Sequence, residues 1–265
     1  MKKCPLCGSV RSRLMFPTSQ SVRQVPESLF SCTSTGYTIH GPIYRCSSCS
    51  LAYISDQTSV GQIIRQYKVV DDPIYVAEAA ARVKTFHRHL GSLEPFKGKR
   101  LLDVGAYTGL FVSLARNKYH INLTLGVLRP GYFKPASFEV ITLWDVVEHF
   151  PDPKRAMQIC YAYLKRGGWI AMSTINIDSL IARLLGRRWP WLMQMHRVYF
   201  SPATMRKLLV DAGFTNVSIR VHIRYISLGY LWSRFVSTVQ LPNWLRGIII
   251  PFYIGDLFDV YAQKI

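Results

Sequence analysis

The chain contains 265 residues, of which 49% are hydrophobic, and it carries a formal net charge of +18. This length and apolar content allow one catalytic-size domain with a small appendage and exclude an intrinsically disordered chain. The apolar runs fall short of the roughly 20 residues of a membrane span, and the N-terminus lacks the apolar core of a signal peptide. We therefore expect a cytoplasmic protein. The charge favours anionic partners, of which nucleic acid is less favoured because no Lys/Arg run has interleaved aromatics.

Four cysteines in the first 55 residues form two matched Cys-x-x-Cys pairs with 38 residues between them. A structural zinc ion takes four thiolates in a tetrahedron, and a gap of two residues lets one tight turn direct two thiolates to the same point. The pattern therefore predicts a zinc-ribbon-like domain over residues 1–55 with one structural Zn²⁺. Cys32 and Cys160 have no such partner and are expected to be small buried residues. The predicted zinc ligands are Cys4, Cys7, Cys46 and Cys49.

Residues 56–98 are expected to form a helical connector. Within this range, "IYVAEAAARVKTFHRHLGSL" places apolar side chains near helical spacing. His87 and His89 are two residues apart, so they would not share one face of a helix, and both are expected at the surface.

The segment "LLDVGAYTGLF", residues 101–111, joins two apolar runs through a pair of glycines. The first run is typical of a buried parallel strand that ends near Asp103, and the second is typical of a helix. Gly105 and Gly109 allow the backbone to approach a ligand, and the start of a helix offers free N–H groups. This order of strand, glycine turn and helix indicates the first unit of a nucleotide-binding fold.

Later segments extend the same alternation. "FEVITLWDVVEHFPDP" predicts a strand over residues 138–144, and "AMQICYAYLKRGGWIAMSTIN" predicts a helix, a turn at Gly167–Gly168 and a strand over residues 169–175. Strands that alternate with helices favour an α/β fold with a parallel sheet. Further along, "FTNVSIRVHIRYI" and "GDLFDVYAQKI" predict two more strands, with a helix over residues 228–247.

In this order and spacing, the segments resemble those of class I S-adenosylmethionine-dependent methyltransferases, especially the group with an N-terminal zinc-binding segment. "DVGAYTG" resembles the cofactor loop, "LWDVVEHFPDP" the segment after the fourth strand, and "LKRGGWIAMSTIN" the turn and fifth strand. "DSLIARLLGRRWPWL" and "HRVYFSPATMRKLLVDAGF" resemble the cap and the helix after it. The resemblance implies a doubly wound, Rossmann-like α/β sheet over residues 99–265, with a cap segment at about residues 176–200.

The resemblance also implies a function, namely methyl transfer from S-adenosylmethionine to a small-molecule acceptor or to one linked to a lipid or glycan. Alignment of nucleophile and methyl group provides most of the catalysis, because the sulfonium is already activated. An oxygen or nitrogen nucleophile can require a base, for which His149 and His196 are the candidates. The implied cofactor-binding residues are Asp103, Gly105, Ala106, Tyr107, Gly109, Trp144 and Asp145.

Glu148 and His149 have a second interpretation. Some RNA-end and quinone O-methyltransferases use an acid-x-x-Glu-His run to bind a divalent metal that holds the acceptor hydroxyl. The run from Asp145 to His149 fits that spacing, and His196 would add a ligand. The favoured interpretation is that Glu148 and His149 only fix the turn after the strand.

One departure from the family pattern bears on activity. In the family, the second strand ends with an acid that binds both ribose hydroxyls, and a helix and a third strand follow. Here "HINLTLGVLRPGYFKPASFEV" places Leu128 at that position if "LTLGVL" is the second strand, and in either alignment the domain is short by a helix and a strand. Loss of two charge-assisted hydrogen bonds weakens cofactor binding. A catalytically impaired relative that serves as a binding or scaffold module is therefore the alternative function.

The cap segment combines an apolar helix face with basic and aromatic side chains. Arg183, Arg187 and Arg188 flank the apolar stripe, and Trp189 and Trp191 follow it. Such a helix either closes the active site as a lid, which is the favoured interpretation, or lies on an anionic membrane surface. The second interpretation would make the protein peripheral to a membrane.

Overall fold

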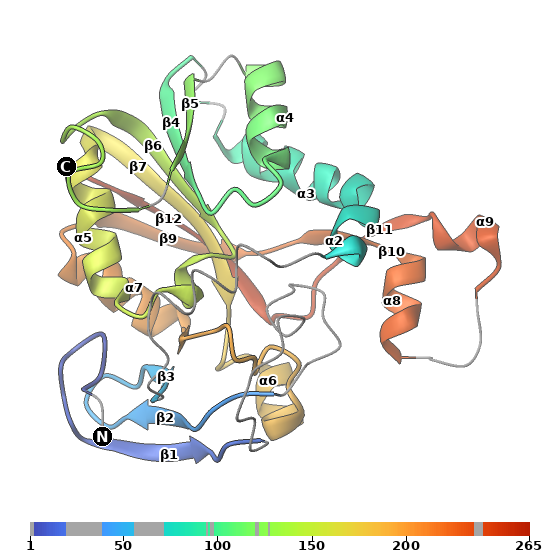
Figure 1. The fold of residues 1–265 in the computed structure, drawn as a ribbon, viewed down its shortest axis with the longest axis horizontal. Coiled ribbons are helices and arrows are strands. Elements are labelled where there is room, and N and C mark those ends of the chain that lie inside the picture. The colour runs from blue at the N-terminus through green and yellow to red at the C-terminus, as the bar shows by residue number, and fades with distance from the viewer. Residues whose placement is uncertain are drawn as a thin grey trace.

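The computed structural model is built around one six-stranded sheet, with a smaller sheet beside it (Figure 1). Cys32 and residues 56–71 of the predicted connector lie outside the described residues. The structure describes residues 3–19, 39–55, 72–93, 95, 98–119, 122–126, 128–235 and 241–265.

The six-stranded sheet has the order β5-β4-β6-β7-β12-β9. Strands β5, β4, β6 and β7 run parallel, whereas β12 is antiparallel to β7 and to β9. This arrangement confirms the predicted Rossmann-like α/β sheet. The six strands are β4 (Arg100–Val104), β5 (Asn122–Gly126), β6 (Phe138–Trp144), β7 (Leu164–Ile175), β9 (Thr215–Val221) and β12 (Leu257–Gln263).

Helices cover both faces of this sheet (Figure 1). On one face, Leu90 and Phe111 of α3 and α4 pack against Val140, and on the other face α5 and α7 contribute Met157 and Leu208 to the main core. Because both faces are covered, β4 and β6 consist of nearly continuous apolar runs instead of alternating ones. The four helices are α3 (Ala79–Ser92), α4 (Leu110–Tyr119), α5 (Pro153–Tyr163) and α7 (Pro202–Asp211).

The sheet is shortened after its first helix, as predicted. Strand β5 pairs in parallel with β4 at the edge of the sheet, so it occupies the place of the second strand. Residues 128–137 contain neither helix nor strand, and β6 follows them directly. Leu128, which stands where the ribose-binding acid is expected, is half-buried and packs against the main core.

A second sheet joins the N-terminal segment to the cap. Its order is β1-β2-β3-β8, and β3 meets β8 where Ala52 pairs with Tyr199 and Tyr53 with Val198. Leu6 and Tyr53 share the main core with Val198, so the N-terminal segment is packed onto the body. The strands are β1 (Ser12–Phe16), β2 (Ile43–Cys46), β3 (Ala52–Ile54) and β8 (Val198–Tyr199).

An arm formed by strands β10 and β11 and helices α8 and α9 extends away from the body (Figure 1). The two strands pair with each other, and β10 lies along α3. Residues 228–247 were predicted to form one helix, and the structure has two helices there, α8 and α9. None of the described helices is long and apolar enough to cross a bilayer. The remaining elements are α2 (Pro73–Ala77), α6 (Leu180–Leu185), α8 (Leu228–Phe235), α9 (Asn243–Arg246), β10 (Arg224–Ser227), β11 (Ile249–Phe252), and the 3-10 turns η3 (Val147–His149) and η4 (Gly186–Arg188).

Asp103 lies inside the sheet and not on its open edge. Its carboxylate accepts a hydrogen bond of 2.6 Å from the Thr142 hydroxyl of β6, and the residue is only 2% exposed. Burial raises the pKa of Asp103 to about 7, and the hydrogen bond from Thr142 offsets only part of this effect. The carboxyl group therefore changes its charge near neutral pH.

We predict that Asp103 makes the protein less stable as the pH rises. An unfolded Asp ionises with a pKa of about 3.9. Between about pH 4 and pH 7 the folded state therefore holds the Asp103 proton while the unfolded state has lost it. A state that binds more protons loses stability as the pH increases. The contribution of Asp103 to the free energy of unfolding should fall by on the order of 1–4 kcal/mol across this window.

The Asp103→Asn variant tests this prediction, because its amide oxygen still accepts from Thr142 but cannot ionise. Urea unfolding at a series of pH values should show the variant gaining stability relative to the natural protein as the pH rises. Asp211→Asn changes an exposed carboxylate on α7 and serves as the control. A difference between natural protein and Asp103→Asn that does not vary with pH would contradict the prediction.

Candidate functional site

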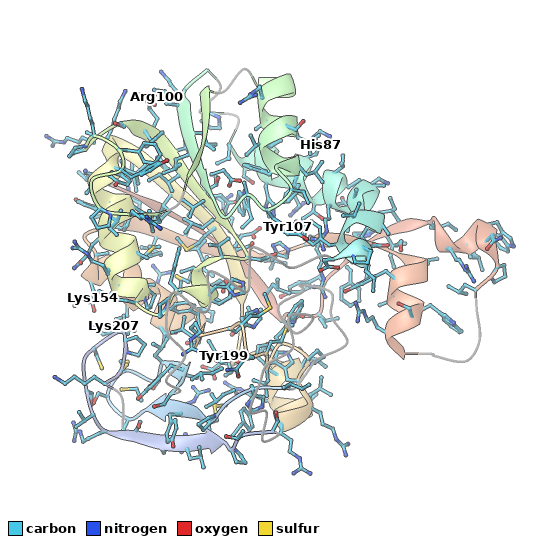
Figure 2. All side chains as sticks on the ribbon, in the orientation of Figure 1. His87, Arg100, Tyr107, Lys154, Tyr199 and Lys207 are labelled. Atoms are coloured by element: carbon cyan, nitrogen blue, oxygen red, sulfur yellow. The ribbon has the colours of Figure 1, made fainter. Side chains whose placement is uncertain are left out.

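The loop after β4 requires glycine at Gly105 for two reasons. Gly105 has a φ of +79°, and a Cβ at this position would lie 2.6 Å from Val146 Cγ2. Gly109 has a φ of +75° with open space around it, and Tyr107 has a φ of +43°. Such left-handed conformations are readily adopted only by glycine. In Figure 2, Arg100 marks the start of β4 and Tyr107 lies beyond its end, near the centre of the molecule.

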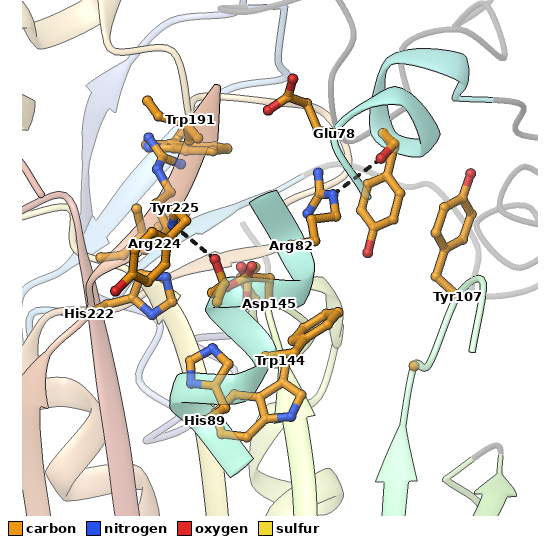
Figure 3. A pocket seen from close by; sticks show the side chains of 18 of the residues that line it. Glu78, Arg82, His89, Tyr107, Trp144, Asp145, Trp191, His222, Arg224 and Tyr225 are labelled. Carbon is orange, nitrogen blue, oxygen red and sulfur yellow. Dashed lines mark hydrogen bonds between the residues drawn. The ribbon is translucent and has the colours of Figure 1, made fainter. Parts of the chain in front are cut away.

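A cavity of about 180 Å³ lies at this edge of the sheet. Helices α2 and α3, the loop after β4, the end of β6, the cap segment and β10 contribute to its wall (Figure 3). Doubly wound folds bind ligands at the carboxyl ends of their strands, so this is the expected place for a cofactor or substrate. Of the predicted cofactor residues, Gly105, Tyr107, Trp144 and Asp145 line the cavity, whereas Asp103, Ala106 and Gly109 do not.

Aromatic rings form much of the cavity wall. Tyr107 meets Tyr75 of α2 edge to face, with 4.7 Å between the ring centroids, and the Arg82 guanidinium lies 3.4 Å from the centroid of Tyr75. Trp144 stacks against His89 of α3, with 3.9 Å between their centroids. The Trp144 Nε1 and the His89 Nδ1 are buried without a hydrogen-bond partner among the described residues. Buried polar atoms without a partner are rare in folded proteins.

Asp145 follows β6 in a strained backbone conformation. Its φ is +54°, a value that is uncommon outside glycine. The Asp145 N–H donates to Ser173 of β7, and the Ser173 hydroxyl donates to Asp145 Oδ1 at 2.6 Å. These bonds hold the exposed Asp145 at the rim of the cavity. Strained residues that neighbouring strands fix in place are common at functional sites.

Glu148, His149 and His196 come together on the cap side of the cavity. One potential ligand atom of each lies within 4.8 Å of the other two. The His149 Nδ1 lies 3.0 Å from the Met195 carbonyl oxygen, and the His196 Nδ1 lies 2.8 Å from the Trp191 carbonyl oxygen. A histidine that is oriented by a backbone carbonyl in this way is typical of metal ligands.

Burial governs the charge of this cluster. It lowers the pKa of His149, and together with His149 it lowers the pKa of His196 to about 3. Burial and the nearby Asp145 raise the pKa of Glu148 to about 8. All three groups are therefore neutral near pH 7. Glu148 also accepts a hydrogen bond of 2.9 Å from the Thr174 hydroxyl of β7, which is the contact expected of a residue that fixes the turn.

Sequence reasoning missed a second cluster on the opposite wall, made by His89, His222 and Asp259. All three residues are buried, with potential ligand atoms within 4.8 Å of one another. His222 Nδ1 donates to Asp259 Oδ1 at 2.7 Å. The expected surface position of His89 is wrong, because the ring is enclosed between Trp144 and His222. Local spacing carried no signal for this cluster, since its members come from α3, the end of β9 and β12.

The cap segment contributes its later part to the cavity. Trp191, Met193, Met195 and His196 line the wall, and Trp191 Nε1 donates to Asp256 at 2.7 Å. Helix α6 does not line the cavity. Its apolar side chains include Leu180 and Leu184, each 73% exposed, and the three arginines of the cap are exposed as well.

The four predicted zinc ligands converge beside the smaller sheet. The sulfur atoms of Cys4 and Cys49 lie 3.5 Å apart, and those of Cys7 and Cys46 lie 3.6 Å apart. Zinc–sulfur bonds of about 2.3 Å in a tetrahedron place the sulfurs about 3.8 Å from one another. A disulfide would require about 2.05 Å. The spacing therefore fits four thiolates around one ion, and Cys160, which has no such partner, is buried as predicted.

Comparisons with known proteins find methyltransferases. A ubiquinone biosynthesis O-methyltransferase of Paraburkholderia phymatum is 36% identical over 128 residues, which are 38% of this chain and 53% of that protein. A protein of the same name from Paracidovorax citrulli is 29% identical over 117 residues, which are 34% of this chain and 49% of that protein. The chain thus spans about half the length of these curated relatives.

Solved structures include a SAM-dependent methyltransferase, described as a possible histamine N-methyltransferase, from Thermotoga maritima. It is 16% identical, with a TM-score of 0.49, over 76% of this chain and 96% of that one. The family model described as a methyltransferase domain matches residues 75–219, from α2 into β9. This match covers more than half of the sequence and includes the loop after β4 and the strained end of β6. The chain therefore belongs to the methyltransferase domain family.

Proposed function

We propose that the chain transfers a methyl group from S-adenosylmethionine to the hydroxyl of a small molecule. The observation that carries this proposal is the common cavity onto which the Gly105 loop and the Trp144–Asp145 strand end both open. The relatives are named O-methyltransferases, which supports oxygen as the acceptor atom. The composition of the cavity wall agrees, since aromatic rings suit both an adenosyl cofactor and a flat acceptor.

The loop after β4 fits the methionine end of S-adenosylmethionine. Gly105 and Tyr107 face the cavity, and the open space around Gly109 leaves room near the start of α4. We propose that Ala106 and Asp103 support this loop from behind, since neither lines the cavity. The cofactor would supply an activated methyl group, so the protein's contribution is to align the acceptor oxygen with it and to exclude water.

The ribose end fits less well. Leu128 follows β5 where an acid is expected, and residues 128–137 contain no Asp or Glu. We therefore propose that binding is weaker than in a methyltransferase with that acid. The same observation favours the alternative function, in which the chain is a catalytically impaired relative that serves as a binding or scaffold module.

We propose that His149 and His196 contact the acceptor as neutral imidazoles. A pKa of about 3 for His196 gives this ring little capacity to take up a proton at neutral pH. With Glu148 in its ionised form, the two rings and the carboxylate would form a donor set that suits a divalent cation, and a cation there would orient the acceptor oxygen.

The exposed face of α6 supports an acceptor that is carried on a lipid or glycan. Leu180 and Leu184 project from the body beside Arg183, which is the composition of a helix that lies on an anionic surface. We propose that the protein reaches such acceptors from the cytoplasmic side.

Near the smaller sheet, we propose one structural Zn²⁺ bound by Cys4, Cys7, Cys46 and Cys49. Four thiolates close the coordination sphere, so this ion would stabilise the fold and leave no position open for chemistry. Because Cys4 and Cys46 belong to the main core, the ion would also stabilise the contact between the N-terminal segment and the cap.

The first prediction for this function concerns the glycine loop. Gly105→Val should abolish binding of S-adenosylmethionine, because the side chain would collide with Val146 and displace the loop. Gly98→Val is the matched control, since Gly98 has a similar φ of +74° in open space away from the cavity. Isothermal titration calorimetry measures both. If the natural protein shows no binding at millimolar cofactor, the enzyme assignment fails and the scaffold function is favoured.

The second prediction concerns the ribose end. Leu128→Asp should tighten binding of S-adenosylmethionine by about tenfold or more, because a carboxylate would accept charge-assisted hydrogen bonds from the ribose. Leu128→Asn has nearly the same shape without the charge and should gain much less. Equal affinities for Leu128→Asp and the natural protein would mean that the residue after β5 does not reach the ribose.

The third prediction concerns zinc. Elemental analysis of protein purified without chelator should find one Zn²⁺ per chain. Cys46→Ser should lose the ion and lower the thermal midpoint, whereas Cys160→Ser, which changes a buried cysteine that is not one of the four, should keep the ion. A natural protein without stoichiometric metal would disprove the zinc site.

A further inference from the structure

His222 and Asp259 form a buried pair at the cavity. His222 directly follows β9, and Asp259 lies on β12, which pairs with β9. The His222 Nδ1 and the Asp259 Oδ1 are 2.7 Å apart, and the two residues are 4% and 5% exposed. Antiparallel pairing of two strands thus brings a carboxylate and an imidazole together across 37 positions of sequence.

Of this pair, His222 lines the cavity, whereas Asp259 does not. Because Nδ1 of His222 donates to the carboxylate, the neutral ring carries its lone pair on Nε2, which is the nitrogen left for the cavity. An imidazole with a carboxylate behind it is the arrangement by which enzymes hold a general base in one tautomer and stabilise its protonated form.

Charged groups on the surrounding elements favour proton uptake. Burial lowers the pKa of His222, but the hydrogen bond and charge of Asp259 outweigh burial and leave that pKa raised. Asp145 at the end of β6 acts in the same direction, whereas Arg224 of β10 opposes it. His89 of α3 faces the same ring, with 5.4 Å between the centroids.

His89 is suited to a different role. Burial, followed by His222 and Arg88, holds the pKa of His89 well below its usual value, so this ring stays neutral. It stacks on Trp144 and fixes the wall beside His222. A neutral neighbour adds no repulsion when His222 takes up a proton.

The histidines on the cap side are held differently. The Nδ1 atoms of His149 and His196 lie beside the backbone carbonyls of Met195 and Trp191, and burial is the largest influence on the charge of both rings. Their pKa values are lowered. Among the histidines that line the cavity, His222 is therefore the one whose protonated form the structure stabilises.

We propose that the Asp259–His222 pair is the proton acceptor of the cavity and takes the proton from a phenolic hydroxyl of the acceptor. This inference rests on the proposed methyl transfer. As the acceptor oxygen forms its bond to the methyl carbon, the carbon–sulfur bond breaks and its electron pair stays on sulfur. The hydroxyl proton moves to His222 Nε2, and Asp259 stabilises the imidazolium. His222 gives this proton to water when the product is released.

Acidity and shape both select a phenol. A phenolic hydroxyl ionises with a pKa near 10, as tyrosine does. Water ionises with a pKa near 15.7, which is too far above the pKa of an imidazole for direct proton transfer to it. Proton transfer is most effective when the pKa values of the donor and the acceptor differ little. Phe86, Trp144 and Tyr225 line the same cavity as His222, and their rings would stack on a flat ring. Figure 3 shows Trp144, Tyr225 and His222 among the side chains around it.

Ionisation of 4-nitrocatechol, whose neutral and anionic forms differ in colour, tests the proposal without turnover. The natural protein should bind the probe as the anion, with its apparent pKa at least one unit (tenfold) below that of the free probe. His222→Gln should remove this shift, and Asp259→Asn should reduce it. His87→Gln, on the same helix as His89 but outside the cavity, is the control and should leave the shift intact (Figure 2).

A second measurement uses only the natural protein, so it does not depend on the folding of a variant. Nitrogen-15 NMR of the histidine rings should show His222 becoming protonated when the probe binds. An equal shift in His222→Gln, an unchanged His222 ring on binding, or no binding of the probe at millimolar concentration would each overturn the proposal. Titration of S-adenosylmethionine distinguishes failure of this inference from failure of the proposed methyl transfer. The cofactor should still bind to His222→Gln. If it does not bind to the natural protein, methyl transfer itself is refuted.

Discussion

Parallel pairing of β6 with β4 on one side and β7 on the other is the constraint on which the site depends. Within the sheet, Thr142 of β6 donates to Asp103 of β4, and beyond the strand end Asp145 exchanges hydrogen bonds with Ser173 of β7. These bonds fix the strand ends in register. Gly105 and Asp145 consequently open onto one cavity, although 40 positions separate them in the sequence.

The smaller sheet imposes a second constraint, because it connects the cysteine cluster to the cap. Strand β3 follows the second Cys-x-x-Cys pair and pairs with β8, which follows the cavity-lining His196 by two residues. The backbone N–H of Arg197 also donates to the carbonyl of Glu148. A change in the cysteine cluster would therefore reach the cap side of the cavity through two short contacts.

Histidines on the two walls of the cavity differ in what lies behind each ring. The Nδ1 atoms of His149 and His196 lie beside backbone carbonyls, and burial lowers the pKa of both rings. His222 has a carboxylate beside its Nδ1, which stabilises a positive charge on the ring. Rings of one residue type in the same cavity therefore differ in how readily they take up a proton.

Local sequence determined the elements whose signals are contiguous. The apolar run and glycines of residues 101–111 predicted β4, its loop and α4, and the missing residues before Phe138 predicted the shortened sheet. The turn expected at Gly167–Gly168 instead lies within β7, which already begins at Leu164 and whose pairing with β6 shifts register between Leu164 and Trp169. Only the tertiary structure decided that His89 is buried and that His222 meets Asp259. Antiparallel insertion of β12 between β7 and β9 brings those side chains together, and such long-range strand pairing leaves no periodic trace in the sequence.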